Sequence, residues 1–322
     1  MLRSFRTENL RFVLWQFQCL RIFRKRIRNY SYTLTQLFTY AKINVVIKES
    51  LSKYYSNFLK LFILFSVFYW LFIYFLKSDD QIYFDIFGLL LGLLPIFGVI
   101  LGVYIQNEWG GFKSYVGKSI IFITISLLMW FLGQTTYLFL SKTLGEVPYP
   151  GLPDYFFIFI DIFYTLSMLA VMKYSGAKSQ MSKSKLTYLP LLIIPIASVI
   201  LNIRIFFGDW SSIFSAEASG SETIFNLIYT FGSIADMAVI VITILFSFSK
   251  LGGKMRSAIY LLFVGVVFQY VGDVLYSYVE ARPDFPINGN AADFVYFLSI
   301  ASIIFALIKF NNFAIQQDRQ TI

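Results

Sequence analysis

Three aspartates that lie inside long apolar runs are the residues of this sequence best suited to chemistry. They are Asp161, Asp236 and Asp273, and no Lys or Arg lies well inside any of these runs. An ionised side chain at the centre of a membrane-spanning helix costs about 2.5–3.5 kcal/mol to insert. Each carboxyl must therefore be protonated, hydrated or hydrogen-bonded to another helix. Any of these states suits a site for a cation, a proton or a polar ligand.

Two tyrosines and one glutamine accompany these acids. Tyr164 follows Asp161 by three residues, and Tyr276 follows Asp273 by three residues. Residues three apart share a helix face, so each phenol can donate to its carboxylate and lower the cost of burying it. The predicted cavity consists of six residues: Asp273, Asp161, Gln134, Tyr276, Tyr164 and Asp236.

The composition excludes most other chemistry. Histidine is absent and Cys19 is the only cysteine, which excludes His-dependent triads, haem ligation through histidine, the common zinc enzymes and thiolate metal clusters. We therefore expect no catalytic residue, no metal ion and no cofactor. An intramembrane enzyme would have to use Asp and a bound metal, and it is the least favoured class.

The elements that position these residues are membrane-spanning helices. Of the 322 residues, 57% are hydrophobic and 14% are charged, whereas soluble domains contain about 25% charged residues. A helix is required in lipid because every backbone polar group must be paired within the segment. Eight apolar runs are long enough to cross a bilayer: 61–76, 82–106, 119–140, 154–172, 187–206, 222–248, 257–279 and 293–310.

The distribution of basic residues predicts the orientation. With both termini in the cytoplasm, 23 of the 27 Lys and Arg residues fall on the inside, as the positive-inside rule requires. We therefore expect a multi-pass protein of the plasma membrane with cytoplasmic N- and C-termini. The net charge of +9 then reflects topology and gives no reason to expect nucleic acid as a partner.

Residues 1–60 form a separate basic segment. Its sequence predicts an amphipathic helix on the anionic inner leaflet, followed by a second one at 30–58 that leads into the membrane. A cleaved organellar transit peptide and a docking helix for a cytoplasmic partner are the alternatives. The residues expected at the lipid surface are Arg21, Arg24, Lys25 and Arg28.

The chain contains signs of an internal duplication. Gly133 and Asp154 recur as Gly272 and Asp293 at a constant offset of 139 in the numbering. Because each unit would contain four helices, the two copies would be parallel, and they would span 61–173 and 187–310, followed by a short cytoplasmic tail at 311–322. Convergent loop chemistry is the alternative. The predicted fold is an all-α membrane protein with two parallel four-helix pseudo-repeats.

The position of each polar residue along its helix predicts its depth. At about 1.5 Å per residue, Gln134, Asp161 and Asp273 lie about 10 Å below the outer helix ends, and Asp236 lies deeper. We therefore expect a polar cavity that opens outward between the two units. The alternative is interhelical hydrogen bonding without a ligand.

Two further aspartates occur where helices are expected to begin. Asp154 and Asp293 are expected to cap these helices, because a carboxylate there accepts hydrogen bonds from free backbone amides and complements the helix dipole.

A family resemblance adds to these inferences. The run "GEVPYPGLPDYFF" (145–157) and the later "GDVLYSY" (272–278) resemble multi-helix membrane sensory modules that lie N-terminal to bacterial and archaeal diguanylate cyclases, phosphodiesterases and histidine kinases. The resemblance covers residues 61–310 and implies a stimulus-sensing membrane domain. Because only the short tail at 311–322 follows the last expected helix, it also implies signalling through a separate cytoplasmic output protein, other membrane subunits or the N-terminal segment.

These observations predict a non-enzymatic sensory or signalling membrane protein, or an accessory subunit, with a carboxylate-lined cavity toward the outer face. The alternative is a transporter or channel that moves a cation or small polar solute past intramembrane aspartates. Parallel duplication and helices interrupted by Pro95, Pro190 and Pro195 suit that alternative.

Overall fold

In this computed structural model, the described residues are 34–76, 81–145, 147–175, 220–247, 255–280 and 289–321, with four isolated positions between 193 and 200. No strand occurs among them. One 3-10 helix, η1 (Gly111–Lys113), lies between the second and third of seven α-helices. These are α2 (Leu34–Leu76), α3 (Gln81–Ile105), α4 (Tyr115–Leu144), α5 (Leu152–Tyr174), α8 (Gly220–Ser247), α9 (Arg256–Glu280) and α10 (Ala291–Thr321).

Six helical segments in the described part of the chain are long and apolar enough to cross a membrane, which indicates an integral membrane protein. The predicted span at 222–248 coincides in position with α8, which is not one of the six. The span predicted at 187–206 lies largely outside the described residues. The six segments are Ser52–Leu76, Gln81–Ile105, Tyr115–Leu144, Leu152–Tyr174, Arg256–Tyr276 and Ala291–Gln317.

Helix α2 corrects one boundary. The sequence predicted an amphipathic helix at 30–58 and a separate span at 61–76, whereas a single helix runs from Leu34 to Leu76. No Gly or Pro occurs between these two residues, so nothing interrupts the backbone hydrogen bonds of the helix.

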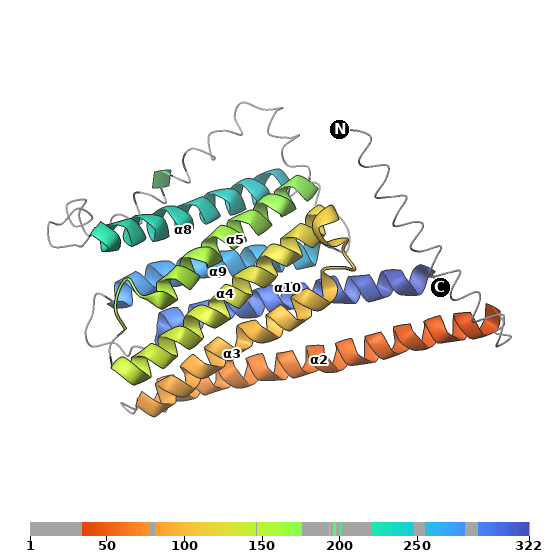
Figure 1. Cartoon of the computed structure of the whole chain (residues 1–322), viewed down its shortest axis with the longest axis horizontal. Helices are drawn as coiled ribbons and strands as arrows, with labels where there is room; N and C mark the ends of the chain where they lie inside the picture. The colour runs from red at the N-terminus through yellow and green to blue at the C-terminus, as the bar shows by residue number, and fades with distance from the viewer. Residues whose placement is uncertain are drawn as a thin grey trace. The chain divides into compact units, whose positions relative to one another are not determined.

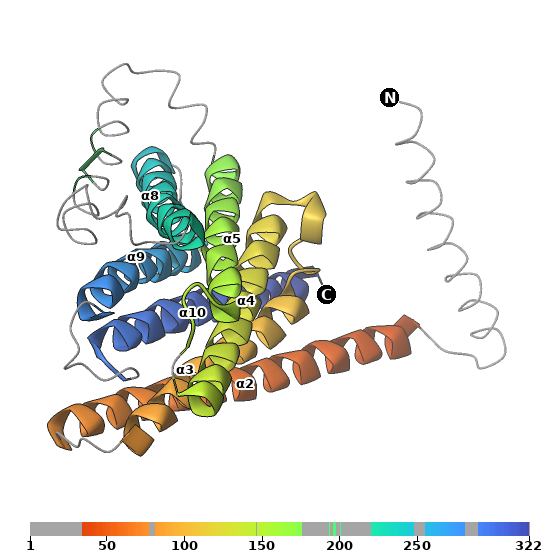
Figure 2. The ribbon, with the colours of Figure 1, turned by 60° about the vertical axis from the view of Figure 1, so that its left-hand side comes forward.

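Residues 54–314 form one compact unit, and the flanking residues 1–53 and 315–322 belong to another. Within the first unit, α3, α4 and α5 form one layer, and α8, α9 and α10 form a second (Figures 1 and 2). Helix α8 packs on α5, where a β-carbon at Gly232 would lie 3.0 Å from Asp161 Oδ2. Helix α10 packs on α3, where the rings of Phe87 and Phe297 are 6.0 Å apart.

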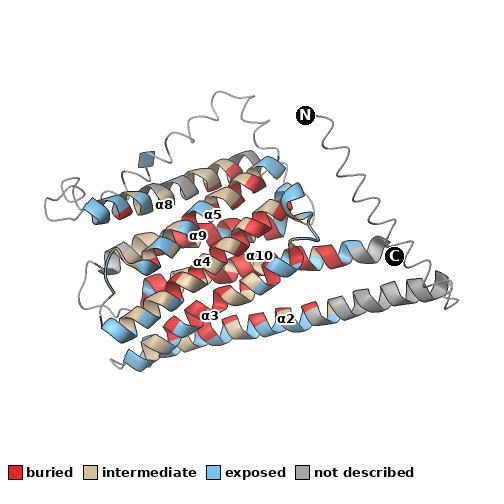
Figure 3. Cartoon of the chain, in the orientation of Figure 1, coloured by how far each residue is buried: buried red, intermediate tan, exposed pale blue. Residues whose placement is uncertain are grey.

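The core of this unit lies where α4, α9 and α10 meet (Figure 3). Helix α10 is buried on several sides, and its Ile300, Ile303, Ile304 and Leu307 are fully buried. Burial around a helix requires apolar residues on every face, which explains why a single apolar stripe is not evident in this segment. Helix α10 therefore contributes to the packing of both layers.

Small residues seven positions apart hold α4 against α5. Ser119 Oγ lies 2.7 Å from Ser167 Oγ, and Ser126 Oγ donates to the Ile160 carbonyl at 3.2 Å. The third small residue is Gly133, where a β-carbon would lie 2.5 Å from the ring of Phe157. Small side chains let two helix backbones approach closely in a membrane.

Helix α9 packs against α10 in the same way. A β-carbon at Gly265 would lie 3.0 Å from the Ser299 carbonyl oxygen, and one at Gly272 would lie 2.5 Å from the ring of Tyr296. Ala258 precedes Gly265 by seven residues and is fully buried. Both helix pairs therefore depend on a row of small residues.

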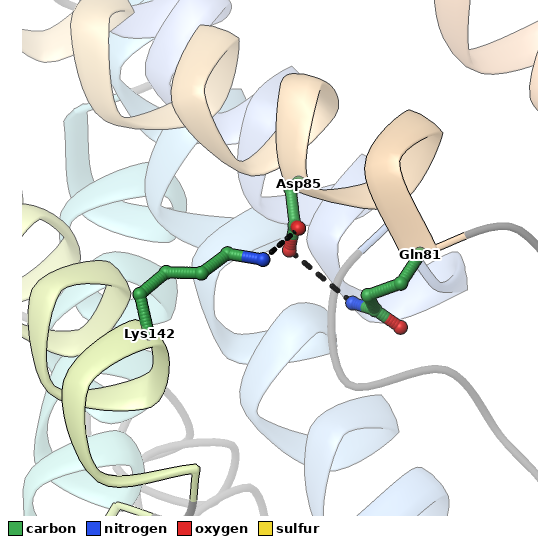
Figure 4. A network of polar contacts seen from close by, with 3 residues as sticks. All are labelled: Gln81, Asp85 and Lys142. Carbon is green, nitrogen blue, oxygen red and sulfur yellow. Dashed lines mark hydrogen bonds and ion pairs between the residues drawn. The ribbon is translucent and has the colours of Figure 1, made fainter.

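Polar contacts join the start of α3 to the end of α4 (Figure 4). The Lys142 ammonium forms an ion pair with the Asp85 carboxylate, and Gln81 Nε2 donates to the second oxygen of Asp85 at 3.3 Å. Asp85 lies near the start of α3, where a carboxylate could cap the helix. The contacts of its carboxylate shown here are with the side chains of Lys142 and Gln81. The Lys142 side chain is 60% exposed, so water screens much of the attraction.

We expect Lys142→Met to lower the free energy of unfolding by less than about 1 kcal/mol, because exposed ion pairs contribute little. Unfolding of the purified protein in detergent, measured at low salt and at high salt, checks this value. The difference between wild type and variant should shrink at high salt, since ions screen the pair. A loss that is large and independent of salt would contradict the prediction.

Candidate functional site

Four side chains from three helices form a hydrogen-bonded cluster, which we call the Asp273 cluster. Trp130 Nε1 of α4 donates to Gln269 Oε1 of α9 at 3.3 Å. Gln269 Nε2 donates to Asp273 Oδ1 at 3.0 Å, and the Tyr296 hydroxyl of α10 donates to the same oxygen at 2.9 Å. Two neutral donors therefore converge on one carboxylate oxygen.

The local sequence explains how these groups meet. Gln269 and Asp273 are four residues apart on α9, so they share a helix face. Gly272 lies beside Asp273 and has no side chain, which lets the Tyr296 ring lie against the backbone of α9. This close approach brings the Tyr296 hydroxyl to Asp273.

Aromatic rings surround the cluster. The Trp130 ring makes edge-to-face contacts with Tyr296 at 5.1 Å and Phe157 at 5.6 Å between centroids. Trp130 and Gln269 are only 4% and 5% exposed, whereas Asp273 and Tyr296 are half-buried. In this low-dielectric setting each hydrogen bond is electrostatically stronger than in water. The arrangement suits a carboxylate that accepts a proton, a cation or a hydrogen-bonding ligand and transmits the change to neighbouring helices.

The two tyrosines expected beside the acids lie in different surroundings. The Tyr276 ring is 6.4 Å from the Tyr296 ring, so it borders the Asp273 cluster. The phenol seen to donate to Asp273 belongs to Tyr296, which comes from the neighbouring helix. Tyr164 is fully buried in the apolar core.

Gln134 and Asp161 lie at other helix interfaces than Asp273. Gln134 is buried against α3, where a β-carbon at Gly92 would lie 3.2 Å from its Cγ atom. Asp161 is buried against Gly232 of α8. The three residues expected around one cavity thus occupy the α3–α4, α5–α8 and α9–α10 interfaces. The sequence predicts only the depth of a residue along its helix and not the direction in which its side chain points. Residues at equal depth can therefore lie at three different interfaces and not around one cavity.

The side chains of the remaining predicted residues lie outside the described part of the chain. Asp236 belongs to α8, but its side chain lies outside the described residues. The predicted lipid-surface residues Arg21, Arg24, Lys25 and Arg28 also lie outside them.

Asp154 and Asp293 lie in the first turns of α5 and α10. The Asp154 carboxylate accepts a hydrogen bond from the Gly151 amide at 2.7 Å. The Asp293 carboxylate accepts one from the Gly289 amide at 2.6 Å, and the Asp293 amide donates to Asn290 Oδ1 at 3.0 Å. Carboxylates that reach back to amides preceding the helix are typical of capping boxes. Both aspartates therefore stabilise helix starts.

Sequence reasoning did not assign Trp130 and Gln269 to the site. The spacing of four residues between Gln269 and Asp273 was a usable signal, because such pairs share a helix face. Trp130 and Gln269 are also separated by 139 in the numbering, which is the spacing of Gly133 and Gly272. The contact between them depends on tertiary packing.

No group of three or more His, Cys, Asp or Glu residues that could hold a metal occurs within the described part of the chain. Comparison of the sequence and structure with protein-family models, curated proteins and solved structures finds no match.

Proposed function

We propose that this chain is a non-enzymatic sensory or signalling membrane protein, or an accessory subunit, that receives its input at the Asp273 cluster. It is a plasma-membrane protein with eight membrane-spanning helices in two parallel repeats, 61–173 and 187–310. Both termini lie in the cytoplasm. Its output passes to a separate cytoplasmic protein or to other membrane subunits. The observation on which this proposal depends is the hydrogen bond between Trp130 and Gln269, which are counterparts in the two proposed repeats.

Matching packing supports the duplication. Helices α5 and α10 begin at Leu152 and Ala291, which differ by 139 in the numbering. At the same offset, Gly133 faces Phe157 and Gly272 faces Tyr296. The row of small residues is also repeated at this offset, with Ser119, Ser126 and Gly133 in α4 and Ala258, Gly265 and Gly272 in α9.

The cluster lies where a twofold axis between the repeats would pass. Around such an axis, only residues close to it contact their own counterparts. Trp130 and Gln269 are counterparts at the offset of 139, and they are hydrogen-bonded to each other. Trp130 also contacts both Phe157 and Tyr296, a second pair of counterparts.

Binding at a site on this axis can move the two repeats relative to each other. A proton, cation or ligand that withdraws Asp273 Oδ1 from Gln269 and Tyr296 would change contacts between α9 and α10, and through Gln269 the contact with α4. A ligand shifts a conformational equilibrium only by binding one state more tightly than the other. The shared cluster provides such a difference, because its bonds depend on how the two halves are placed.

The alternative function is transport of a cation or small polar solute, which parallel repeats and an intramembrane acid also suit. On the proposed cytoplasmic side of the cluster, however, most buried side chains of the described core are apolar, and the buried hydroxyls of Ser119, Thr124 and Ser126 are hydrogen-bonded within α4 or to α5. A polar route through these described residues is therefore not evident, which favours sensing. The apolar side chains are Ile123 and Leu127 of α4, Leu262, Phe263 and Val266 of α9, and Ile300, Ile303 and Ile304 of α10.

Proteoliposomes containing the full chain test this proposal. We expect no flux of H⁺, Na⁺ or K⁺ above that of empty liposomes, with or without a proton gradient. The emission of Trp130 is the part of the tryptophan emission that is lost in Trp130→Phe. We expect this emission to change with external pH or cation concentration in wild type. We expect it to stay constant in Asp273→Asn. Flux that Asp273→Asn abolishes would support transport instead. An emission that responds equally in wild type and Asp273→Asn would overturn the role of the cluster.

A further inference from the structure

We propose that a pocket between α5 and α8 binds a lipophilic ammonium ion, with the ammonium group at Asp161 and the alkyl chain along the apolar walls. The pocket has a volume of about 270 Å³. Its lining residues come from both helices: Ile158, Asp161, Ile162, Thr165 and Leu166 of α5, and Ile228 and Gly232 of α8. This site is separate from the Asp273 cluster.

The pocket combines an apolar rim with a buried acid. Ile162 and Ile228 are exposed large side chains, whereas Asp161 is only 7% exposed. Both helices belong to apolar segments, so the rim is suited to a ligand that arrives from the hydrocarbon of the bilayer. A purely apolar ligand would leave the carboxylate without a role in its recognition.

Gly232 lets the Asp161 side chain lie against α8 at the pocket. A β-carbon at this position would lie 3.0 Å from Asp161 Oδ2 and 3.4 Å from Asp161 Cβ. The 3.0 Å contact is tighter than ordinary van der Waals contact, so a larger residue at position 232 would displace the carboxylate. The glycine therefore allows Asp161 to line the pocket close to the backbone of α8.

The other half of the chain has larger side chains at the corresponding interface. The counterparts of Asp161 and Ile158 at the offset of 139 are Ile300 and Phe297, both fully buried. The counterpart of Gly232 at the offset of 142 is Leu90, which is buried. An acid and a glycine thus replace two large apolar residues in one half only. This comparison rests on the proposed duplication, whereas the pocket itself does not.

The polar groups of the lining favour ammonium over other ions. Asp161 and the hydroxyl of Thr165 are the polar side chains that line the pocket, and a calcium ion takes six to eight oxygen ligands. A carboxylate also disfavours anions. An alkylammonium head has three N–H donors, for which the Asp161 carboxylate and the Thr165 hydroxyl offer acceptors. Its chain can bury apolar surface against Ile158, Ile162 and Ile228.

Photo-crosslinking tests the proposal. The full chain in nanodiscs of zwitterionic lipid is exposed to dodecylamine that bears a diazirine on its chain, and crosslinked peptides are identified by mass spectrometry. We expect labelling of α5 and α8 around Ile162 and Ile228 in wild type and at least tenfold less in Asp161→Asn. A diazirine-tagged dodecanol should label both proteins equally and weakly, because it lacks the charge.

Three variants complete the design. Asp85→Asn removes a different acid near the start of α3 and should leave labelling unchanged. Ile162→Trp should block the rim and reduce labelling while Asp161 is intact, which keeps the test informative if Asp161→Asn elutes as an aggregate. Asp273→Asn should retain labelling, so failure at this pocket is distinguishable from failure of the proposed sensory site.

Two results would overturn the proposal. Equal labelling of wild type and Asp161→Asn by the amine would show a groove that recognises the alkyl chain alone. Absence of labelling on α5 and α8 would show that another part of the chain, lipid or a partner covers the pocket.

Discussion

Replacing Asp273 by alanine is expected to lower the free energy of unfolding by about 2–4 kcal/mol, because two donors lose their shared acceptor. These donors are Gln269 Nε2 and the Tyr296 hydroxyl, and Gln269 also holds Trp130 in place. Asp273→Asn keeps an acceptor oxygen at the same position, so its loss of stability should be much smaller. Unfolding in detergent, followed by tryptophan fluorescence, measures both variants.

Tyr296→Phe separates one bond from the rest of the cluster. It removes a single interhelical hydrogen bond, and such bonds contribute about 0.6 kcal/mol on average and up to roughly 1.7 kcal/mol in membrane proteins. The matched control is Tyr155→Phe, because Tyr155 is exposed and its ring contact with Phe225 stays intact. If Asp273→Ala were no more damaging than Tyr155→Phe, the cluster would have no structural role.

The second large effect is expected at the glycines that receive aromatic rings. Gly272→Leu should lower the free energy of unfolding by about 1–3 kcal/mol or more, since overpacking displaces neighbouring groups. A β-carbon there would lie 2.5 Å from the Tyr296 ring. The displaced Tyr296 can no longer reach Asp273, so the variant should lose the emission response of Trp130 as well as stability. Unfolding and fluorescence titration in proteoliposomes measure the two losses.

Gly133→Leu is the matched variant in the other helix pair. Its β-carbon would lie 2.5 Å from the ring of Phe157, so we expect a comparable loss of stability. Phe157 donates no hydrogen bond to Asp273, and the bond between Tyr296 and Asp273 should persist. Gly220→Ala is the control, because no atom lies within 4 Å of the added methyl group. Equal stability of Gly272→Leu and Gly220→Ala would contradict the packing of α9 on α10.

Much of the secondary structure follows from the sequence. The predicted segments 82–106 and 257–279 correspond closely to α3 (Gln81–Ile105) and α9 (Arg256–Glu280). Long apolar runs have few alternatives, because backbone polar groups in lipid must be paired within a helix. Two boundaries were wrong: the start of α2, and the end of α10, which was predicted at 310 and lies at Thr321. At both places the chain leaves its apolar run without a Gly or Pro to end the helix.

Part of the packing was also visible in the sequence. Gly133 and Gly272 occur inside apolar runs of the sequence, and in the structure each glycine receives the aromatic ring of the next helix. A glycine in an apolar helix commonly marks a close contact, because a missing side chain is of little use elsewhere. The identity of the ring that fills the space could not be predicted in this way.

The sequence by itself determined the membrane class, most helix boundaries and the position of each acid along its helix, because these depend on residue counts along single helices. Only the tertiary structure decided that Tyr296 and Gln269 bind Asp273 and that Asp161 faces Gly232. The rotation of a helix about its own axis and the choice of its neighbour are set by side-chain packing across the whole bundle. A polar residue therefore has a predictable place along its helix but acquires its partners only when the helices assemble.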